Sequence, residues 1–272
     1  MAEEARRRHD TSPTATAALG RTMTATALLG ATLKDDQSIT VRIIGDGPIG
    51  GIIADGDSTG RVRAYVKEPH ADLPNNAQGK LDVGGVVGRD GYIHVTRDLG
   101  FGQPYTGSAP LVSGEIAEDV TNYLYVSEQV PSATALGVLV SREGTVQASG
   151  GYLLQLLPQA DDDVKAELER NLGLLGAVSS AVDAGLTPED ILGRVLQGVP
   201  YHILETRPLR FECTCSQERV IGLVASLGAD EVRSMLNEDQ GAELRCHFCN
   251  KVYQVSADEL QQVLERLEHP PA

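Results

Sequence analysis

The four cysteines of the chain are the residues whose type and spacing point most directly to chemistry. They form two close pairs, CTC at residues 213–215 and CHFC at residues 246–249. Zinc prefers four soft ligands at tetrahedral corners, with each sulfur about 2.3 Å from the ion. Two cysteine turns that face each other can supply these ligands. The sequence therefore predicts that one zinc ion per chain is bound in the reduced protein by Cys213, Cys215, Cys246 and Cys249.

Two other arrangements of these residues have to be considered. Permanent disulfides require an oxidising compartment, but residues 1–10 are charged and carry no apolar core of the kind a secretory signal needs. We therefore expect a cytoplasmic protein with reduced cysteines. His247 lies inside the second pair and can also bind zinc. Because four sulfurs already complete the coordination, we expect its side chain to point outward.

The composition argues against nucleic-acid and membrane partners. The 272 residues carry a formal net charge of −15, which repels phosphate backbones and favours solubility. No apolar run reaches the roughly 20 residues that a membrane-spanning helix requires. Tryptophan is absent and aromatic residues are scarce, so small and branched aliphatic residues must form the core. The overall fold class expected is α+β, with one large domain and a small one.

Residues 1–157 are predicted to form an α/β domain with a mainly antiparallel sheet. Ser12 and Pro13 begin a helix of small residues that runs to Leu33. Strands are expected at 39–44, 51–54, 61–66 and 92–96, helices at 81–87 and 113–127, and a hairpin from 133–140 and 146–157.

The glycines of residues 45–50 spell G-x-G-x-x-G, the dinucleotide fingerprint. That motif requires a helix after the glycines, whereas a strand pattern follows here, so no nucleotide site is expected. The domain also shows no Ser-His-Asp or phosphate-binding constellation, and we do not expect an enzyme.

Residues 158–205 are predicted to form a helical linker. Apolar residues recur at three- and four-residue steps from Val164 to Val182. Gly173 and Gly176 interrupt this pattern, and each costs about 1 kcal/mol relative to alanine. A second helix is expected from Thr187 to Gly198. The segment is either an ordinary linker or a metastable one that can detach and expose its apolar face.

Residues 206–272 are predicted to form a small zinc-binding domain. Strands at 209–212, 242–245 and 251–255 would deliver the cysteines, with helices at 216–227, 230–238 and 256–267. So small a core supplies little stability, whereas a structural zinc site contributes on the order of 10–16 kcal/mol. Loss of the metal should therefore unfold the domain. Because thiolates are the form that oxidants attack, oxidation can act as the unfolding signal.

Two further functions fit a four-cysteine domain. A zinc ribbon can bind nucleic acid, but residues 206–272 hold 7 Lys and Arg against 11 Asp and Glu, which disfavours phosphate contacts. A thiol oxidoreductase can exchange disulfides through a CxxC motif, but that motif usually begins a helix beside a βαβ unit. Here the second pair is expected in a turn between two strands.

Nearly the whole chain resembles the heat shock protein 33 family. The stretches that carry the resemblance include TATAALGRTMTA, GDGPIGGIIAD, GKLDVGGVVG, PYTGSAPLVSGEIAEDV, SEQVPSATALGVLV, SGGYLLQLLP, RFECTCSQERV and CHFCNKVY. The paired CxC and CxxC motifs are the functional signature of that family.

The resemblance implies a redox-regulated holdase chaperone that works without ATP in a stress response. Reduced and zinc-loaded, such a protein is inactive. Oxidant together with heat would form the disulfides Cys213–Cys215 and Cys246–Cys249, release zinc and unfold the C-terminal half. The protein would then form a homodimer and hold unfolding client proteins. Family members usually begin with further strands before the first helix, so we expect an exposed sheet edge in this chain.

Overall fold

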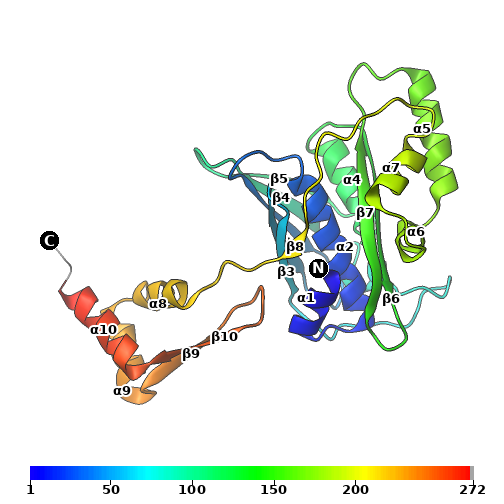
Figure 1. The fold of residues 1–272 in the computed structure, drawn as a ribbon. Coiled ribbons are helices and arrows are strands. Elements are labelled where there is room, and N and C mark those ends of the chain that lie inside the picture. The colour runs from blue at the N-terminus through cyan, green and yellow to red at the C-terminus, as the bar shows by residue number, and fades with distance from the viewer. Residues whose placement is uncertain (270–272) are drawn as a thin grey trace. The chain divides into compact units, whose positions relative to one another are not determined.

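A six-stranded sheet organises the first of the two units into which the chain divides (Figure 1). The computed structural model describes residues 1–269, and the units span Met1–Glu212 and Cys213–Ala272. The strand order is β5-β4-β1-β2-β3-β8, and every pair is antiparallel except β3–β8. The strands are β1 (Ser38–Ile44), β2 (Ile52–Asp57), β3 (Arg61–Val66), β4 (Tyr92–Asp98), β5 (Tyr105–Pro110) and β8 (Arg210–Phe211). The predicted α+β class with a mainly antiparallel sheet is confirmed.

Helix α2 (Pro13–Gly30) packs against both this sheet and the hairpin of β6 (Ser132–Val140) and β7 (Val146–Gln155). The predicted start is confirmed, because the Ser12 hydroxyl accepts a hydrogen bond from the Ala15 amide at 3.3 Å. The hydroxyl groups of buried threonines on the helix form hydrogen bonds within the helix itself. That of Thr22, for example, donates to the carbonyl of Ala18, four residues earlier, at 2.9 Å. These small side chains let the helix lie close to sheet and hairpin at once.

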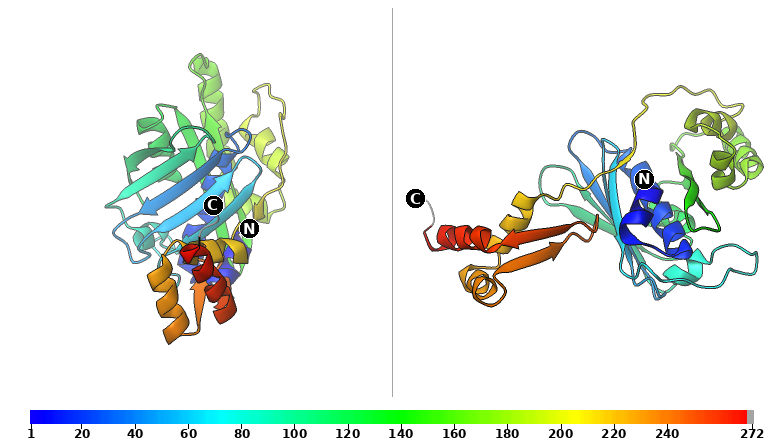
Figure 2. Two further views of the ribbon diagram at one scale, coloured as in Figure 1. Left: turned by 90° about the vertical axis from the view of Figure 1, so that its left-hand side faces the viewer. Right: turned by 60° about the horizontal axis from the view of Figure 1, so that its bottom comes forward.

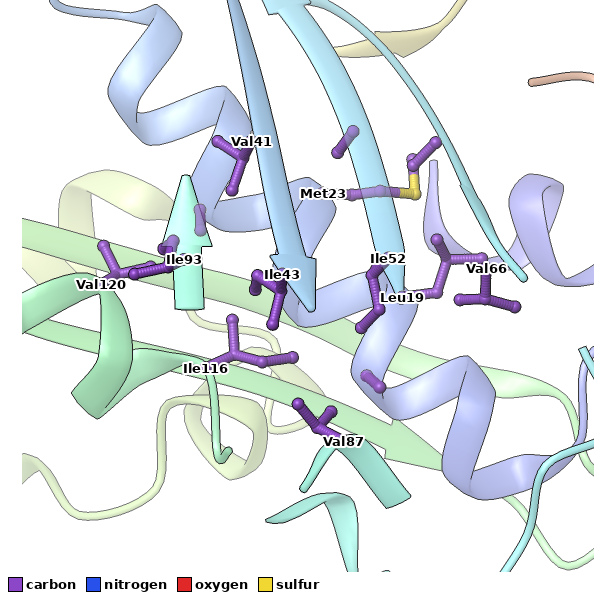
Figure 3. Close-up of a cluster of buried hydrophobic side chains, with 14 of the residues drawn as sticks. Leu19, Met23, Val41, Ile43, Ile52, Val66, Val87, Ile93, Ile116 and Val120 are labelled. Carbon is purple, nitrogen blue, oxygen red and sulfur yellow. The ribbon is translucent and has the colours of Figure 1, made fainter. Parts of the chain in front are cut away.

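The core of the first unit lies between α2 and the sheet (Figure 3). Leu19 and Met23 of α2 are buried there beside alternate residues of the strands. Alternation along a strand sends every second side chain to one face, which is why the core residues recur at steps of two. The residues labelled in the figure are Leu19, Met23, Val41, Ile43, Ile52, Val66, Val87, Ile93, Ile116 and Val120.

Three elements of the first unit differ from the sequence-based expectation. Residues before Ser12 form a separate helix, α1 (Ala2–His9), which ends where Asp10 adopts a left-handed conformation with φ of 50°. Strand β5 was not predicted, because its sequence YTGSAP shows no apolar alternation. Helix α4 (Ala117–Val126) begins after Ser113, since the buried Asp119 carboxylate accepts the Ile116 amide hydrogen bond at 2.8 Å.

The predicted linker consists of three helices rather than two. They are α5 (Asp162–Leu175), α6 (Val178–Asp183) and α7 (Pro188–Val195), and the break after α5 falls at Gly176, whose φ is 68°. Val178, Ile191 and Val195 are buried together next to the hairpin residues Ala135 and Tyr152. Helix α6 therefore lies against the β6–β7 hairpin, as Figure 2 also shows.

A pair of glycines forms the seat for α6. Gly137 and Gly150 are directly opposite each other in the hairpin register. A Cβ atom at Gly137 would lie 2.7 Å from the backbone nitrogen of Ser179, and one at Gly150 would lie 2.9 Å from the Val182 side chain. Any side chain at Gly137 would therefore push α6 away from the strands.

The strand predicted at 209–212 is confirmed as β8, but it joins the sheet of the first unit. It pairs in parallel with β3, and the Arg210 amide donates to the Gly60 carbonyl at 3.0 Å. The guanidinium of Arg8 on α1 lies 5.0 Å from the centre of the Phe211 ring, a distance at which a cation is attracted to an aromatic face. Two residues after this anchored strand, the first cysteine begins the second unit.

The second unit contains one hairpin and three helices: β9 (Gly241–Arg245), β10 (Val252–Ser256), α8 (Gln217–Ala225), α9 (Ala229–Glu238) and α10 (Ala257–Glu268) (Figure 2). All five were predicted. The capping box at Ser256 is confirmed, because Ser256 and Glu259 exchange side chain to amide hydrogen bonds of 2.9 and 3.3 Å. The fully buried core is small and consists of Val224, Val232, Val255, Leu260, Val263 and Leu264. Among the described residues, none of the helices combines the length and apolar character needed to cross a membrane.

The glycines of the G-x-G-x-x-G stretch allow two segments of backbone to pack closely together. Strand β2 follows them, as predicted, and a Cβ atom at Gly45 or Gly47 would overlap the carbonyl oxygens of α3 (Val83–Val87). The Gly47 amide instead donates to the Val87 carbonyl at 3.0 Å. The connection between β1 and β2 therefore needs residues without a Cβ atom in order to lie against α3.

We predict that Gly45→Ala destabilises the first unit by about 2–3 kcal/mol, because the new methyl group must displace backbone. Gly193→Ala is the matched control, since its Cβ would make only ordinary contact with Tyr201 and alanine favours the helix. Urea unfolding of both variants, followed by circular dichroism, tests this. Equal midpoints for the two variants would contradict it.

Candidate metal centre

Two turns of the second unit bring the four cysteines together. Cys213 and Cys215 lie just before α8, and Cys246 and Cys249 lie in the turn that joins β9 to β10. The second turn is closed by backbone hydrogen bonds, from the Cys246 amide to the Lys251 carbonyl at 2.9 Å and from the Asn250 amide to the Cys246 carbonyl at 2.8 Å. Asn250 takes the left-handed conformation, with φ of 59°, that so tight a turn needs.

The four sulfur atoms all lie within 4.8 Å of one another. The Sγ atoms of Cys213 and Cys246 are 3.7 Å apart, and those of Cys215 and Cys249 are 3.3 Å apart. A tetrahedral site with bonds of about 2.3 Å has edges of about 3.8 Å. The donor set and the spacing thus fit one metal ion of the size and preference of zinc. This is the only cluster of three or more potential metal-binding side chains within residues 1–269.

His247 is not part of the sulfur cluster. Its side chain is exposed, and neither ring nitrogen belongs to the cluster that the described residues form. The burial of the cysteines also differs. Cys249 is buried, whereas Cys213, Cys215 and Cys246 are half-buried. A small oxidant in solution can therefore approach three of the sulfurs.

Two side chains that the sequence did not single out support the first cysteine pair. The guanidinium of Arg219 on α8 donates to the carbonyl and the hydroxyl of Thr214, at 3.1 and 2.8 Å, and fixes the turn to the helix. The hydroxyl of Tyr253 on β10 donates to the Cys215 sulfur at 3.0 Å. No motif marks Tyr253, because it lies 38 residues from its partner and reaches it only through the β9–β10 hairpin.

The protein shifts the pKa values of two cysteines in opposite directions. At Cys215 burial opposes ionisation, but hydrogen bonds from Tyr253 and the neighbouring thiols outweigh it and lower the pKa from 9.0 to about 7. Burial raises the pKa of the Cys249 thiol to about 12. The hydrogen bond to Cys215 in turn raises the pKa of the Tyr253 hydroxyl. Without a metal, Cys215 therefore ionises more readily near neutral pH than Cys249 does.

Comparison with known proteins agrees with the earlier resemblance. The family model described as Hsp33 protein matches residues 1–256. The 33 kDa chaperonin of Symbiobacterium thermophilum is 56% identical over 264 residues, which cover 97% of this chain and 89% of that protein. The 33 kDa chaperonin of Desulforamulus reducens is 51% identical over 266 residues, which cover 98% of this chain and 90% of that protein.

A solved structure shares the fold. The crystal structure of the 33 kDa chaperonin (heat shock protein 33 homolog) from Thermotoga maritima matches with a TM-score of 0.89 and 36% sequence identity, over 97% of this chain and 90% of that one. Sequence and structure agree across nearly the full length. The chain therefore belongs to the Hsp33 family.

Proposed function

We propose that this protein is a redox-regulated holdase chaperone that works without ATP and whose switch is the second unit. The four sulfur atoms within 4.8 Å of one another carry the proposal, in a chain whose relatives are named 33 kDa chaperonins. Cys213, Cys215, Cys246 and Cys249 would hold one zinc ion in the reduced state. The bound ion would supply the positive charge and the cross-link that keep four thiolates together.

Oxidation would remove this ligand set. The lone pair of one sulfur attacks a peroxide oxygen, the O–O bond breaks, and a sulfenic acid and water result. A second cysteine sulfur then attacks the sulfenic sulfur, and the oxygen leaves as water once a proton has been added. The two cysteines that form each disulfide thus give two electrons to one peroxide. Two disulfides use all four sulfurs, so none remains as a thiolate ligand.

The pairing of the disulfides decides whether the second unit unfolds. The two close sulfur contacts in the reduced structure join the two turns, Cys213 with Cys246 and Cys215 with Cys249. Disulfides across these contacts would link the two turns covalently and preserve the fold. The pairing that we propose, Cys213–Cys215 and Cys246–Cys249, leaves the turns unconnected. Given the small core of this unit, unfolding would follow.

The client-binding surface that we propose lies on the helices α5–α7 and the segment that follows them. Leu174 on α5 and Leu204 beyond α7 are 83% and 88% exposed, and further apolar side chains of α6 and α7 are covered only while these helices stay on the hairpin. Unfolding proteins expose apolar segments that such a surface can hold without ATP. Oxidised chains would bind each other in the same way, which accounts for the proposed homodimer. We also propose that the protein works in the cytoplasm by binding and not by catalysis.

Two alternative functions require different features of the second unit. A nucleic-acid binder needs a basic surface, but residues 206–272 hold more acidic than basic side chains. A thiol oxidoreductase usually has its CxxC motif at the start of a helix, whereas Cys246 and Cys249 lie in the turn between two strands. Gel shift at low salt and an insulin-reduction assay separate these functions from a chaperone.

The first prediction that follows from the proposed function concerns metal content. The purified reduced protein should contain one zinc per chain, and Cys249→Ser should lose it because three thiolates bind far more weakly than four. His247→Ala is the control and should keep one zinc. Chelation in reducing buffer should remove on the order of 10 kcal/mol of folding free energy from the second unit. Elemental analysis and amide exchange of α8–α10 measure both effects, and zinc loss in His247→Ala would contradict the ligand assignment.

The second prediction concerns the switch. Peroxide with mild heat should consume four thiols per chain, release the zinc and suppress aggregation of a denatured client, whereas reduced protein at the same temperature should not protect. Peptide mapping should find the pairs Cys213–Cys215 and Cys246–Cys249. Cross-turn disulfides, or oxidised protein that fails to protect the client, would defeat the proposal.

The third prediction tests the client surface. Gly137→Ala should lift α6 from the hairpin, since the new methyl group meets the Ser179 backbone, at a cost of about 1–3 kcal/mol. The undocked population should rise about fivefold or more, and the reduced, zinc-loaded variant should protect clients without oxidant. Gly173→Ala on α5, where a Cβ meets nothing within 4 Å, is the control. Faster amide exchange in α6 without client protection would exclude this surface.

A further inference from the structure

One hydroxyl group contacts the sulfur cluster from the buried side of the second unit. The Tyr253 Oη atom lies 3.0 Å from the Cys215 Sγ atom and donates a hydrogen bond to it. The Tyr253 side chain is only 5% exposed, so little water competes for that bond. Its position is fixed by the β9–β10 register, in which Tyr253 pairs with Leu244 two residues before Cys246.

A second contact makes this hydroxyl a stronger donor. The Lys251 ammonium lies 4.9 Å from the centre of the Tyr253 ring, within the range of a cation–π interaction. A positive charge over the ring draws electron density from the phenol oxygen, and the O–H group donates more strongly as a result. Lys251 lies directly before β10, two residues from Tyr253 in the sequence KVY at 251–253, so the chain itself keeps the charge close to the donor.

The hydrogen bond acts on the lone pairs through which sulfur reacts. Attack on a peroxide oxygen requires a sulfur lone pair, and a donated hydrogen bond stabilises that pair and lowers its nucleophilicity. Metal binding is affected less, because a sulfur can bind an ion through one lone pair while another accepts a hydrogen bond. The bond therefore opposes oxidation more than it opposes metal binding.

We infer that Tyr253 is a positioning residue that sets the oxidant threshold of the switch by restraining the Cys215 sulfur. The inference rests on the proposed function, since it assigns the regulation of the same site. In the zinc-loaded protein Cys215 would already be ionised, so the hydrogen bond no longer promotes ionisation and only weakens the attack of this sulfur on peroxide. The reduced, zinc-loaded protein therefore tolerates low peroxide. The spacing of the cysteines in the sequence does not indicate this role of Tyr253.

The test compares Tyr253→Phe with wild type, using the full zinc-loaded chain and limiting hydrogen peroxide. The phenyl ring keeps the packing and removes only the donor. One hydrogen bond corresponds to about a fivefold change in rate, so Tyr253→Phe should release zinc about fivefold faster. Tyr125→Phe, at an exposed tyrosine of the first unit, is the control and should behave as wild type. Lys251→Gln should give a smaller acceleration.

A spectroscopic readout separates this role from a structural one. In the cobalt-substituted protein, loss of a hydrogen bond to a thiolate should shift the sulfur-to-metal charge-transfer band to lower energy in Tyr253→Phe and leave it unchanged in Tyr125→Phe. Equal release rates for Tyr253→Phe and wild type, both with one zinc per chain, would overturn the inference. So would a Tyr253→Phe protein that binds no zinc, because the hydroxyl would then hold the site together. Wild type that contains no zinc would instead refute the proposed function.

Discussion

Repulsion between four closely placed thiolates is the constraint on which the second unit depends. Two unit charges about 4 Å apart repel by about 1 kcal/mol in water and about 4 kcal/mol near a protein surface. The sulfurs of this protein lie within 4.8 Å of one another, so without a cation they cannot all ionise. Burial adds to the difficulty at Cys249, whose pKa it raises, whereas at Cys215 hydrogen bonds outweigh burial and lower the pKa. A divalent cation would relieve this repulsion, and the four cysteines could hold one.

The two units differ in what they need to stay folded. The first buries a large contiguous core between α2, the six-stranded sheet and the β6–β7 hairpin. In the described part of the second unit, the core consists of six buried aliphatic side chains, and a loop of more than thirty residues is closed between the two cysteine turns. Loop closure costs conformational entropy that so small a core barely offsets. The second unit therefore depends less on its core than the first does, and the switch that we propose would use this difference in local stability.

The cysteine cluster and most elements could be predicted because their signals are local. Spacing alone indicated the four sulfurs, and Ser12, Ser256 and the apolar periodicity indicated helix starts that the structure confirms. The rest depends on contacts between distant residues. The parallel pairing of β8 with β3, the seat that Gly137 and Gly150 form for α6, and the edge strand β5 leave no periodic pattern. Tyr253 belongs to the same class, since an ordinary strand tyrosine gains its role only when a hairpin brings it to Cys215.

The position of Tyr253 also has an optical consequence. The chain lacks tryptophan, and Tyr253 is the single tyrosine of the second unit. Phenol emission is therefore not masked by indole, and one of the eight tyrosine chromophores reports directly on the surroundings of the sulfur cluster. Electron-rich sulfur beside an excited phenol quenches its light, so opening of this unit carries an intrinsic fluorescence signal that needs no added dye.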